Sequence, residues 1–194
     1  MIAGSGQQAM RCFISITLPE EIKRGMTAIQ GSLRASGADV SWTRPEGIHL
    51  TLKFLGEVEE KRVPKIAAAL DNAVNGIGAF SLSVSGMGTF PDRRRPRVVW
   101  IGLKEDGDSL IKLQENVGRE LVTIGFPLEK RGFTPHVTLG RIRSNRSIEK
   151  LLDLIGEEKG VELNGFTVTK VHLMESQLRS TGAIYTELYS AALI

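Results

Sequence analysis

The sequence predicts an α+β protein of two related lobes, each with a mostly antiparallel sheet and with helices on the outside. Strand-like and helix-like segments alternate along the chain, and several strand-like segments follow one another directly, which favours antiparallel pairing. In addition, His-Leu-Thr-Leu at residues 49–52 returns as His-Val-Thr-Leu at residues 136–139, an offset of 87 positions. The same offset relates helix-like segments, so the repeat has the scale of a lobe.

Composition narrows the class of protein. A chain of 194 residues with 41% hydrophobic content can bury a substantial core in one unit, and a net charge of +3 suits an anionic ligand without identifying it. The single cysteine, Cys12, cannot form an internal disulfide and is expected in the core. There is no apolar run of the roughly 20 residues that a membrane span needs, and no secretory signal pattern, so we expect a cytoplasmic protein.

The chain is expected to open with a leader, a strand and an amphipathic helix. Residues 1–9 are small and polar without periodicity, so we expect a disordered leader or tag remnant before a single bilobal domain at 10–194. The strand that begins at Arg11 is stopped by Pro19, and Gly37 ends the helix that follows. Four apolar residues mark one face of this helix: Ile22, Met26, Ile29 and Leu33.

Two kinds of pattern place the remaining elements. Alternation of apolar and polar residues predicts strands, and apolar residues at every third or fourth position predict helices. Gly56 is expected to close the first motif strand, and two prolines that bracket an arginine run predict a loop at 91–96. The expected strands are 39–43, 48–54, 79–84 with an extension at 87–90, 98–103, 136–142, 166–175 and 184–191. The expected helices are 59–74, 108–124 and 148–155.

Each motif strand is expected to turn its polar side chains to one face. Successive side chains of a strand alternate between faces, so His49 shares a face with Thr51, and His136 shares one with Thr138. Side chains two positions apart lie roughly 6–7 Å from each other along the strand, so both can reach one small anion. The intervening aliphatic residues then pack on the core.

Two histidines and two threonines suit metal-free acid/base chemistry at phosphorus. Imidazole has an ordinary pKa of about 6.5, so one ring can be neutral and take a proton from water while the other is protonated and donates to the departing sugar oxygen. Threonine hydroxyls can hydrogen-bond the non-bridging oxygens. The residues alone do not decide which histidine is the acid. A zinc site is the rival, but two histidines without a carboxylate or cysteine at ligand spacing do not complete a tetrahedral set, so no metal or cofactor is expected.

Residues near the motifs are candidates for further contacts. Arg131, five positions before the second histidine, could hold a phosphate in bidentate geometry, and Lys53 has the strand parity of Thr51 and could reach the same phosphate. The third histidine, His172, lies outside any His-x-Thr pattern, and a structural or surface role is expected for it. Three aromatic residues are expected in the core: Trp42, Phe54 and Trp100.

Three segments carry a resemblance to a known family. They are His49-Leu-Thr-Leu-Lys-Phe-Leu-Gly56 after Arg44-Pro-Glu, Phe90-Pro followed by Arg95-Pro-Arg97-Val-Val-Trp, and Phe133-Thr-Pro-His-Val-Thr-Leu139. With them the chain resembles the 2H phosphoesterase superfamily, and closely its RNA 2′,3′-cyclic phosphodiesterase (2′-5′ RNA ligase) branch, over roughly residues 10–191.

The resemblance implies a bilobal 2H phosphoesterase-like fold with pseudo-twofold symmetry and a central groove that holds both motifs. It also implies that His49 is the proton donor to the leaving 3′-oxygen, that His136 is the proton acceptor acting on water, and that Thr51 and Thr138 hold the phosphate. The implied substrate is RNA or an oligonucleotide with a 2′,3′-cyclic phosphate end, such as a tRNA half, and the product is a 2′-phosphomonoester. The reverse reaction, 2′-5′ ligation without ATP, is also implied. A monomer without a membrane partner is expected.

Two alternative functions stay open from the sequence. The same four residues could cleave 2′-5′ oligoadenylate or an ADP-ribose cyclic phosphate. A non-catalytic RNA-binding module would keep the groove without turnover. Hydrolysis assays on these substrates separate the three hypotheses.

Overall fold

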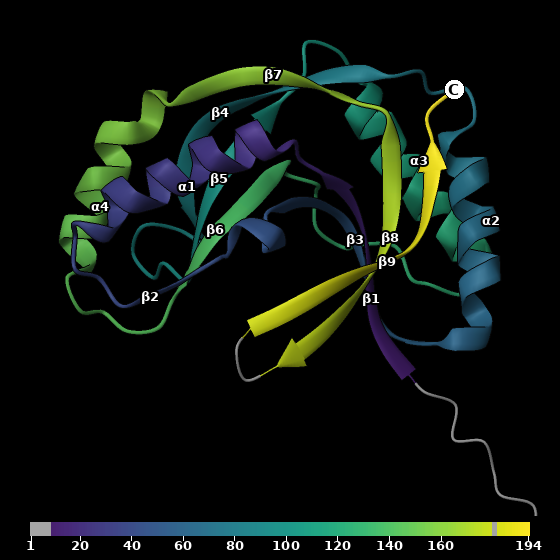
Figure 1. The fold of residues 1–194 in the computed structure, drawn as a ribbon, viewed down its shortest axis with the longest axis horizontal. Helices are drawn as coiled ribbons and strands as arrows, with labels where there is room; N and C mark the ends of the chain where they lie inside the picture. Colours follow the sequence, from purple (N-terminus) through teal and green to yellow (C-terminus); the bar gives the residue numbers. More distant parts are fainter. Residues whose placement is uncertain (1–8, 180–181) are drawn as a thin grey trace, which may run out of the picture.

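The computed structural model describes residues 9–179 and 182–194, which form one nine-stranded sheet with four α-helices (Figure 1). The strands are β1 (Ala9–Thr17), β2 (Val40–Trp42), β3 (His49–Glu59), β4 (Phe80–Phe90), β5 (Val98–Lys104), β6 (His136–Ile142), β7 (Glu162–Val168), β8 (Lys170–Arg179) and β9 (Gly182–Ala192). The helices are α1 (Glu20–Arg34), α2 (Val63–Val74), α3 (Ser109–Thr123) and α4 (Ile148–Glu157), with short 3-10 turns η1 (Pro45–Gly47), η2 (Glu60–Arg62) and η3 (Glu158–Gly160).

The order of the strands shows the internal repeat. The sheet runs β7-β4-β5-β6-β3-β1-β8-β9, with β2 paired to β6, and the pairings between described strands are antiparallel. The two motif strands, β3 and β6, are neighbours in the middle, and β1 and β5, which correspond to each other in the repeat, flank them on either side. The predicted α+β fold of two pseudo-symmetric halves is confirmed. The halves share one curled sheet because β3 pairs directly with β6.

The helices lie outside the sheet and connect its two halves. Helix α1 follows β1 but contacts α4 and β7 of the other half, whereas α3 follows β5 but contacts α2 and β3 of the first half (Figure 1). The four apolar residues predicted for the first helix are buried in the core that both halves share. Each such side chain contributes about 1.5–3 kcal/mol when fully buried rather than exposed. This crossed packing makes the position of one motif strand depend on the other half.

Most predicted elements are present, with three differences. β3 continues through Gly56, whose φ of +74° bends the strand, and pairs with β1 as far as Glu59. The predicted strand at 166–175 is two strands, β7 and β8, because β7 pairs with β4 and β8 pairs with β1 in the other half of the sheet. Ala9 is already part of β1, and residues 1–8 of the predicted leader lie outside the described residues. None of the described helices is long and apolar enough to cross a membrane.

Candidate active site

The two motifs meet in the centre of the sheet. The residues that separate histidine from threonine in each motif, Leu50 and Val137, are paired partners in the β3–β6 ladder. In an antiparallel pair this register sets each histidine across from the threonine of the other motif. Directly opposed residues have Cβ atoms about 4.5–5.5 Å apart. One compact group therefore contains His49, Thr51, His136 and Thr138.

These four side chains lie on the face of the sheet that the helices do not cover, which we call the inner face. Leu50, Leu52, Val137 and Leu139, which alternate with them, are at most 3% exposed and belong to the core that also contains the helix residues. The histidines and threonines are half-buried. The predicted separation of polar and aliphatic faces in both motifs is confirmed.

Both imidazole rings are held by the backbone two residues earlier. The Nδ1 atom of His136 lies 2.6 Å from the carbonyl oxygen of Thr134, and the His49 ring forms a backbone hydrogen bond with Gly47. A carbonyl oxygen only accepts, so Nδ1 of His136 carries the hydrogen and Nε2 remains for a ligand.

Aromatic rings enclose His49. The Phe13 ring stacks on it at a centroid distance of 4.7 Å, and the Tyr185 ring contacts it edge-on at 5.3 Å. Burial lowers the pKa of His49 to about 4, although the hydrogen bond with Gly47 acts in the opposite direction, and the charge of Lys23 lowers the pKa further. Without a ligand, His49 is therefore neutral near neutral pH.

The surroundings of His136 differ. Phe90 meets its ring edge-on at 4.9 Å, and Trp100 lies farther away, at 6.4 Å. Trp100 pairs with Thr138 in the β5–β6 ladder and is half-buried beside the site, so its predicted place in the core is wrong. The other predicted core tryptophan, Trp42, is half-buried and packs against the core.

A bulge follows the first motif. Thr51 pairs with Ser15 of β1, whereas Lys53 pairs with the adjacent residue Ile14, so Leu52 is an extra residue in β3. A bulge of this kind reverses the alternation of faces beyond it. Residues 53 and 54 therefore exchange the faces that the sequence predicts for them.

The bulge corrects two predictions. Lys53 does not share the face of the first motif: it is 3% exposed, and its Nζ atom donates a hydrogen bond of 2.6 Å to the carbonyl oxygen of Pro127. Phe54, predicted in the core, is 61% exposed, and its ring lies 6.2 Å from that of Phe13 on the inner face. Lys53 is a buried structural lysine, and Phe54 adds an exposed ring beside His49.

Arg131 lies in the segment between α3 and β6, where its side chain is exposed. It lines a cavity of about 340 Å³ together with Lys53 and residues of α3. Lys53 and α3 both lie on the helix-covered side of the sheet. The predicted contact between Arg131 and a substrate phosphate stays a prediction.

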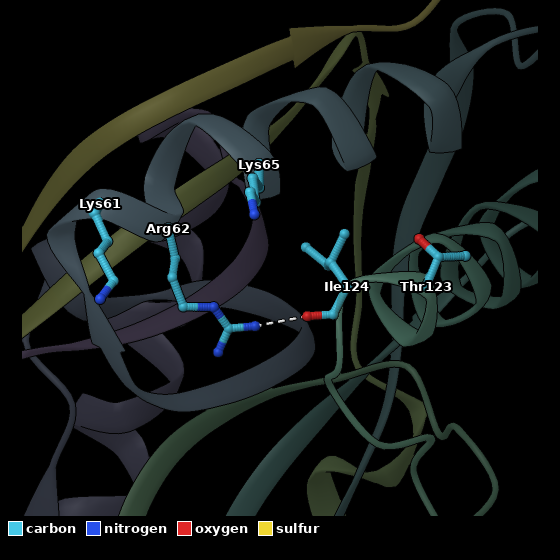
Figure 2. Close-up of a pocket in the computed structure, with 5 residues that line it drawn as sticks. All are labelled: Lys61, Arg62, Lys65, Thr123 and Ile124. Atoms are coloured by element: carbon cyan, nitrogen blue, oxygen red, sulfur yellow. Dashed lines mark hydrogen bonds between the residues drawn. The ribbon is translucent and has the colours of Figure 1, made fainter.

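A larger hollow, of about 590 Å³, lies between the start of α2 and the end of α3 (Figure 2). Here the Arg62 guanidinium donates a hydrogen bond of 2.7 Å to the carbonyl oxygen of Ile124 and lies 4.3 Å from the centre of the Phe126 ring. A cation at the carboxyl end of a helix satisfies unpaired carbonyl groups. Arg62 therefore caps α3, and this hollow is lined by none of the motif residues.

The sequence did not point to three polar residues of the inner face. Thr17 pairs with His49 in the β1–β3 ladder, and its Oγ1 atom lies 3.2 Å from Nε2 of His172, whose Nδ1 atom lies 2.6 Å from Oε2 of Glu187. Thr17 has the strand parity of Ser15, and the alternation of these two residues with Ile14 and Ile16 was the local signal for a polar face in β1. His172 and Glu187 reach the inner face because β8 and β9 are added beside β1, and nothing in the sequence around either residue indicates this position. The described residues contain no group of three or more His, Cys, Asp or Glu side chains arranged for a metal ion.

Comparison with known proteins agrees with this arrangement. A family model described as LigT like phosphoesterase matches the chain twice, over residues 16–100 and 101–185, and each match contains one motif. A Thermotoga maritima protein called RNA 2′,3′-cyclic phosphodiesterase is 39% identical over 181 residues, covering 93% of this chain and 94% of its own. One of the same name from Methanothermobacter thermautotrophicus is 36% identical over 179 residues, covering 92% and 96%.

Two solved structures have the same fold. The protein TT0787 of Thermus thermophilus superposes with a TM-score of 0.79 at 25% identity and covers 95% of this chain and 98% of its own. Escherichia coli LigT complexed with 3′-AMP superposes with a TM-score of 0.74 at 25% identity and covers 96% and 99%.

Proposed function

The chain belongs to the LigT-like phosphoesterase family, and from this premise we propose that it hydrolyses the 2′,3′-cyclic phosphate end of RNA or a nucleotide to a 2′-phosphomonoester. The observation that carries the proposal is the pairing of Leu50 with Val137, because it brings two imidazoles and two hydroxyls onto one face. The names of the relatives support the same substrate class.

The proposed reaction uses the two histidines as an acid/base pair. The oxygen of a water molecule attacks phosphorus while a neutral imidazole takes the proton from that water. The bond between phosphorus and the 3′-oxygen breaks, and a protonated imidazole supplies the proton to the 3′-oxygen. Thr51 and Thr138 donate hydrogen bonds to the non-bridging oxygens. These steps balance without a metal ion.

The resemblance assigns His49 as the proton donor and His136 as the proton acceptor, and we keep this assignment in the proposal. The enclosure of His49 bears on it, because a pKa of about 4 leaves the ring without a proton to donate in the ligand-free protein. A bound phosphodiester carries a negative charge, which raises the pKa of a neighbouring imidazole. The assignment therefore requires His49 to take up its proton as substrate binds. The reverse assignment, with His49 as the base, is the second candidate.

A sulfur-substituted substrate separates the two assignments. If the 3′-oxygen is replaced by sulfur, the leaving thiolate needs no proton, so loss of the general acid is compensated while loss of the base is not. We expect the 3′-thio substrate to restore turnover to His49→Ala but not to His136→Ala. Rescue of His136→Ala alone would reverse the assignment.

The overall function is tested with purified protein in EDTA. The substrates are 2′,3′-cyclic AMP, an RNA with a cyclic phosphate end, 2′-5′ oligoadenylate and ADP-ribose 1″,2″-cyclic phosphate. We expect hydrolysis of the first two to 2′-phosphates. Preference for either of the others would support the alternative phosphodiesterase functions, and RNA binding without any turnover would support a binding module.

The predictions from the sequence about the natural substrate, the oligomeric state, the location and the reverse reaction form part of the same proposal. They are RNA substrates such as tRNA halves, action as a monomer, a cytoplasmic location and ATP-independent 2′-5′ ligation. Ligation is measured by incubating an RNA with a 2′,3′-cyclic end and an RNA with a 5′-hydroxyl without ATP. A 2′-5′-linked product that requires both histidines is expected.

A further inference from the structure

A second polar cluster lies beside the motif residues on the inner face. His172 of β8 links Thr17 of β1, through a contact of 3.2 Å, to Glu187 of β9, through a hydrogen bond of 2.6 Å. The imidazole side chain is 12% exposed and the glutamate side chain 49%, and Thr17 is exposed. The histidine is therefore the buried member, and it holds two accessible oxygen-bearing side chains in fixed places.

The position of this cluster next to His49 rests on two separate contacts. Thr17 is the ladder partner of His49 in the β1–β3 pair, where opposed Cβ atoms lie about 4.5–5.5 Å apart. Glu187 lies two residues after Tyr185 on β9, and the Tyr185 ring contacts the His49 ring at 5.3 Å. A nucleotide whose phosphate lies at His49 therefore has the cluster within reach of its base.

The hydrogen-bonding capacity of the cluster is mostly that of an acceptor. The carboxylate accepts from Nδ1–H of His172, and with a neutral ring the Thr17 hydroxyl donates to Nε2. The oxygen of Thr17 and the second carboxylate oxygen of Glu187 then remain as acceptors. A carboxylate repels a phosphate, so a neutral group with N–H donors fits this pair better than an anion.

We propose that Glu187 and Thr17, oriented by His172, recognise the amino group of the nucleobase in the nucleotide that carries the cyclic phosphate. This inference rests on the proposed function, because it places the phosphate of that nucleotide at His49. Cytosine and uracil are the sharpest pair for it: cytosine presents an amino donor where uracil presents a carbonyl acceptor. Glu187 accepts from the first and opposes the second. His172 is a positioning residue in this account.

The experiment compares kcat/KM for 2′,3′-cyclic CMP with kcat/KM for 2′,3′-cyclic UMP. We expect a ratio of about 10 or more in the wild type, since a site built for a hydrogen-bond donor rejects the analogue without it. Glu187→Gln offers an amide donor to uracil, so the ratio should fall to near 1. His172→Ala should lower the ratio several-fold by releasing Glu187, a change that lost stability alone would not produce.

Glu175→Gln is the matched control for Glu187→Gln, because Glu175 lies on β8, the strand beside β9, but pairs with Cys12 and has the strand parity of the core-side residues. It should keep the wild-type ratio. The affinities of the products 2′-CMP and 2′-UMP, measured by calorimetry, test the same preference for cytosine without turnover. Failure of hydrolysis and failure of base recognition are therefore distinguished. Equal kcat/KM values for the two substrates in the wild type, equal affinity or no binding of the two products, or an unchanged ratio in Glu187→Gln would overturn the proposal.

Discussion

The two motif histidines occupy equivalent places in the repeat but different surroundings. Each ring is held by the backbone two residues earlier, and each has an aromatic residue 36 positions before it, Phe13 in one half and Trp100 in the other. Phe13 stacks on His49 at 4.7 Å, whereas Trp100 lies 6.4 Å from His136. The repeat fixes where the rings are, and their neighbours fix how well they are shielded from water.

A glycine accounts for part of this difference. A Cβ atom at Gly47 would lie 3.2 Å from Cε2 of Tyr185, so the absence of a side chain lets that ring approach His49. The equivalent residue in the second motif is Thr134, which has a side chain. The two copies of the motif therefore lie in different surroundings, and in the first copy the enclosure lowers the pKa of His49.

The largest effect is expected from removing either ring. His49→Ala and His136→Ala should each lower kcat by about 10²–10⁴-fold, because in the proposed reaction each ring carries one of the two proton transfers. The measurement is hydrolysis of 2′,3′-cyclic AMP, with thermal unfolding as the control for folding. Full activity in either variant would show that the two histidines do not act together as acid and base.

Stability as a function of pH should separate the two histidines. The pKa of His49 is lowered from 6.5 to about 4 by burial. Between pH 6.5 and 4, His49 is therefore protonated in the unfolded chain and neutral in the folded chain. The folded state should therefore lose up to about 3 kcal/mol from this site as the pH falls from 6.5 to 4. Urea unfolding at several pH values measures it. His49→Gln should remove this part of the slope and His136→Gln should keep it; the same slope in both variants would contradict the burial argument.

The threonines should matter less than the histidines and to a similar degree in both halves. Thr51→Val and Thr138→Val keep the shape of the side chain but remove the hydroxyl. Each should lower kcat/KM by about 10–100-fold, the value of one hydrogen bond to a charged group. Thr186→Val, also in the sheet but outside the motifs, is the control. An effect confined to one motif would show that only half of the site holds the phosphate.

The smallest expected effect concerns the enclosure itself. Tyr185→Ala should admit water to His49 and raise its pKa toward the ordinary value, while turnover at neutral pH changes only a few-fold. Titration of the ring protons by NMR measures the shift. Phe90→Ala, which exposes the His136 ring instead, should leave the pKa of His49 unchanged. An unchanged pKa of His49 in Tyr185→Ala would show that residues other than Tyr185 shield this ring from water.

Local patterns were sufficient to predict the motif strands and their faces. Alternation placed His49 and His136 opposite the core, and helical spacing identified the buried stripe of α1. Pairing of β3 with β6 was not predictable from these patterns, because the partners are 87 residues apart and no turn between them sets their register. The same holds for Tyr185, which reaches His49 only because the two last strands are added beside β1.

The bulge shows where alternation fails. Leu52, Lys53 and Phe54 read equally well as a continued alternation, and nothing in these three residues marks the extra one. The slip is set by the register with β1, which is a tertiary property. Lys53 and Phe54 were therefore predicted on the wrong faces while the motif residues just before the bulge were predicted correctly.

The most direct test of the account is a crystal structure with a bound 2′-nucleotide. We expect one phosphate within hydrogen-bond distance of Nε2 of both His49 and His136, with the hydroxyls of Thr51 and Thr138 on its oxygens. A phosphate bound elsewhere, in the hollow beside Arg62 or next to Arg131, with the two rings in contact with solvent only, would contradict it.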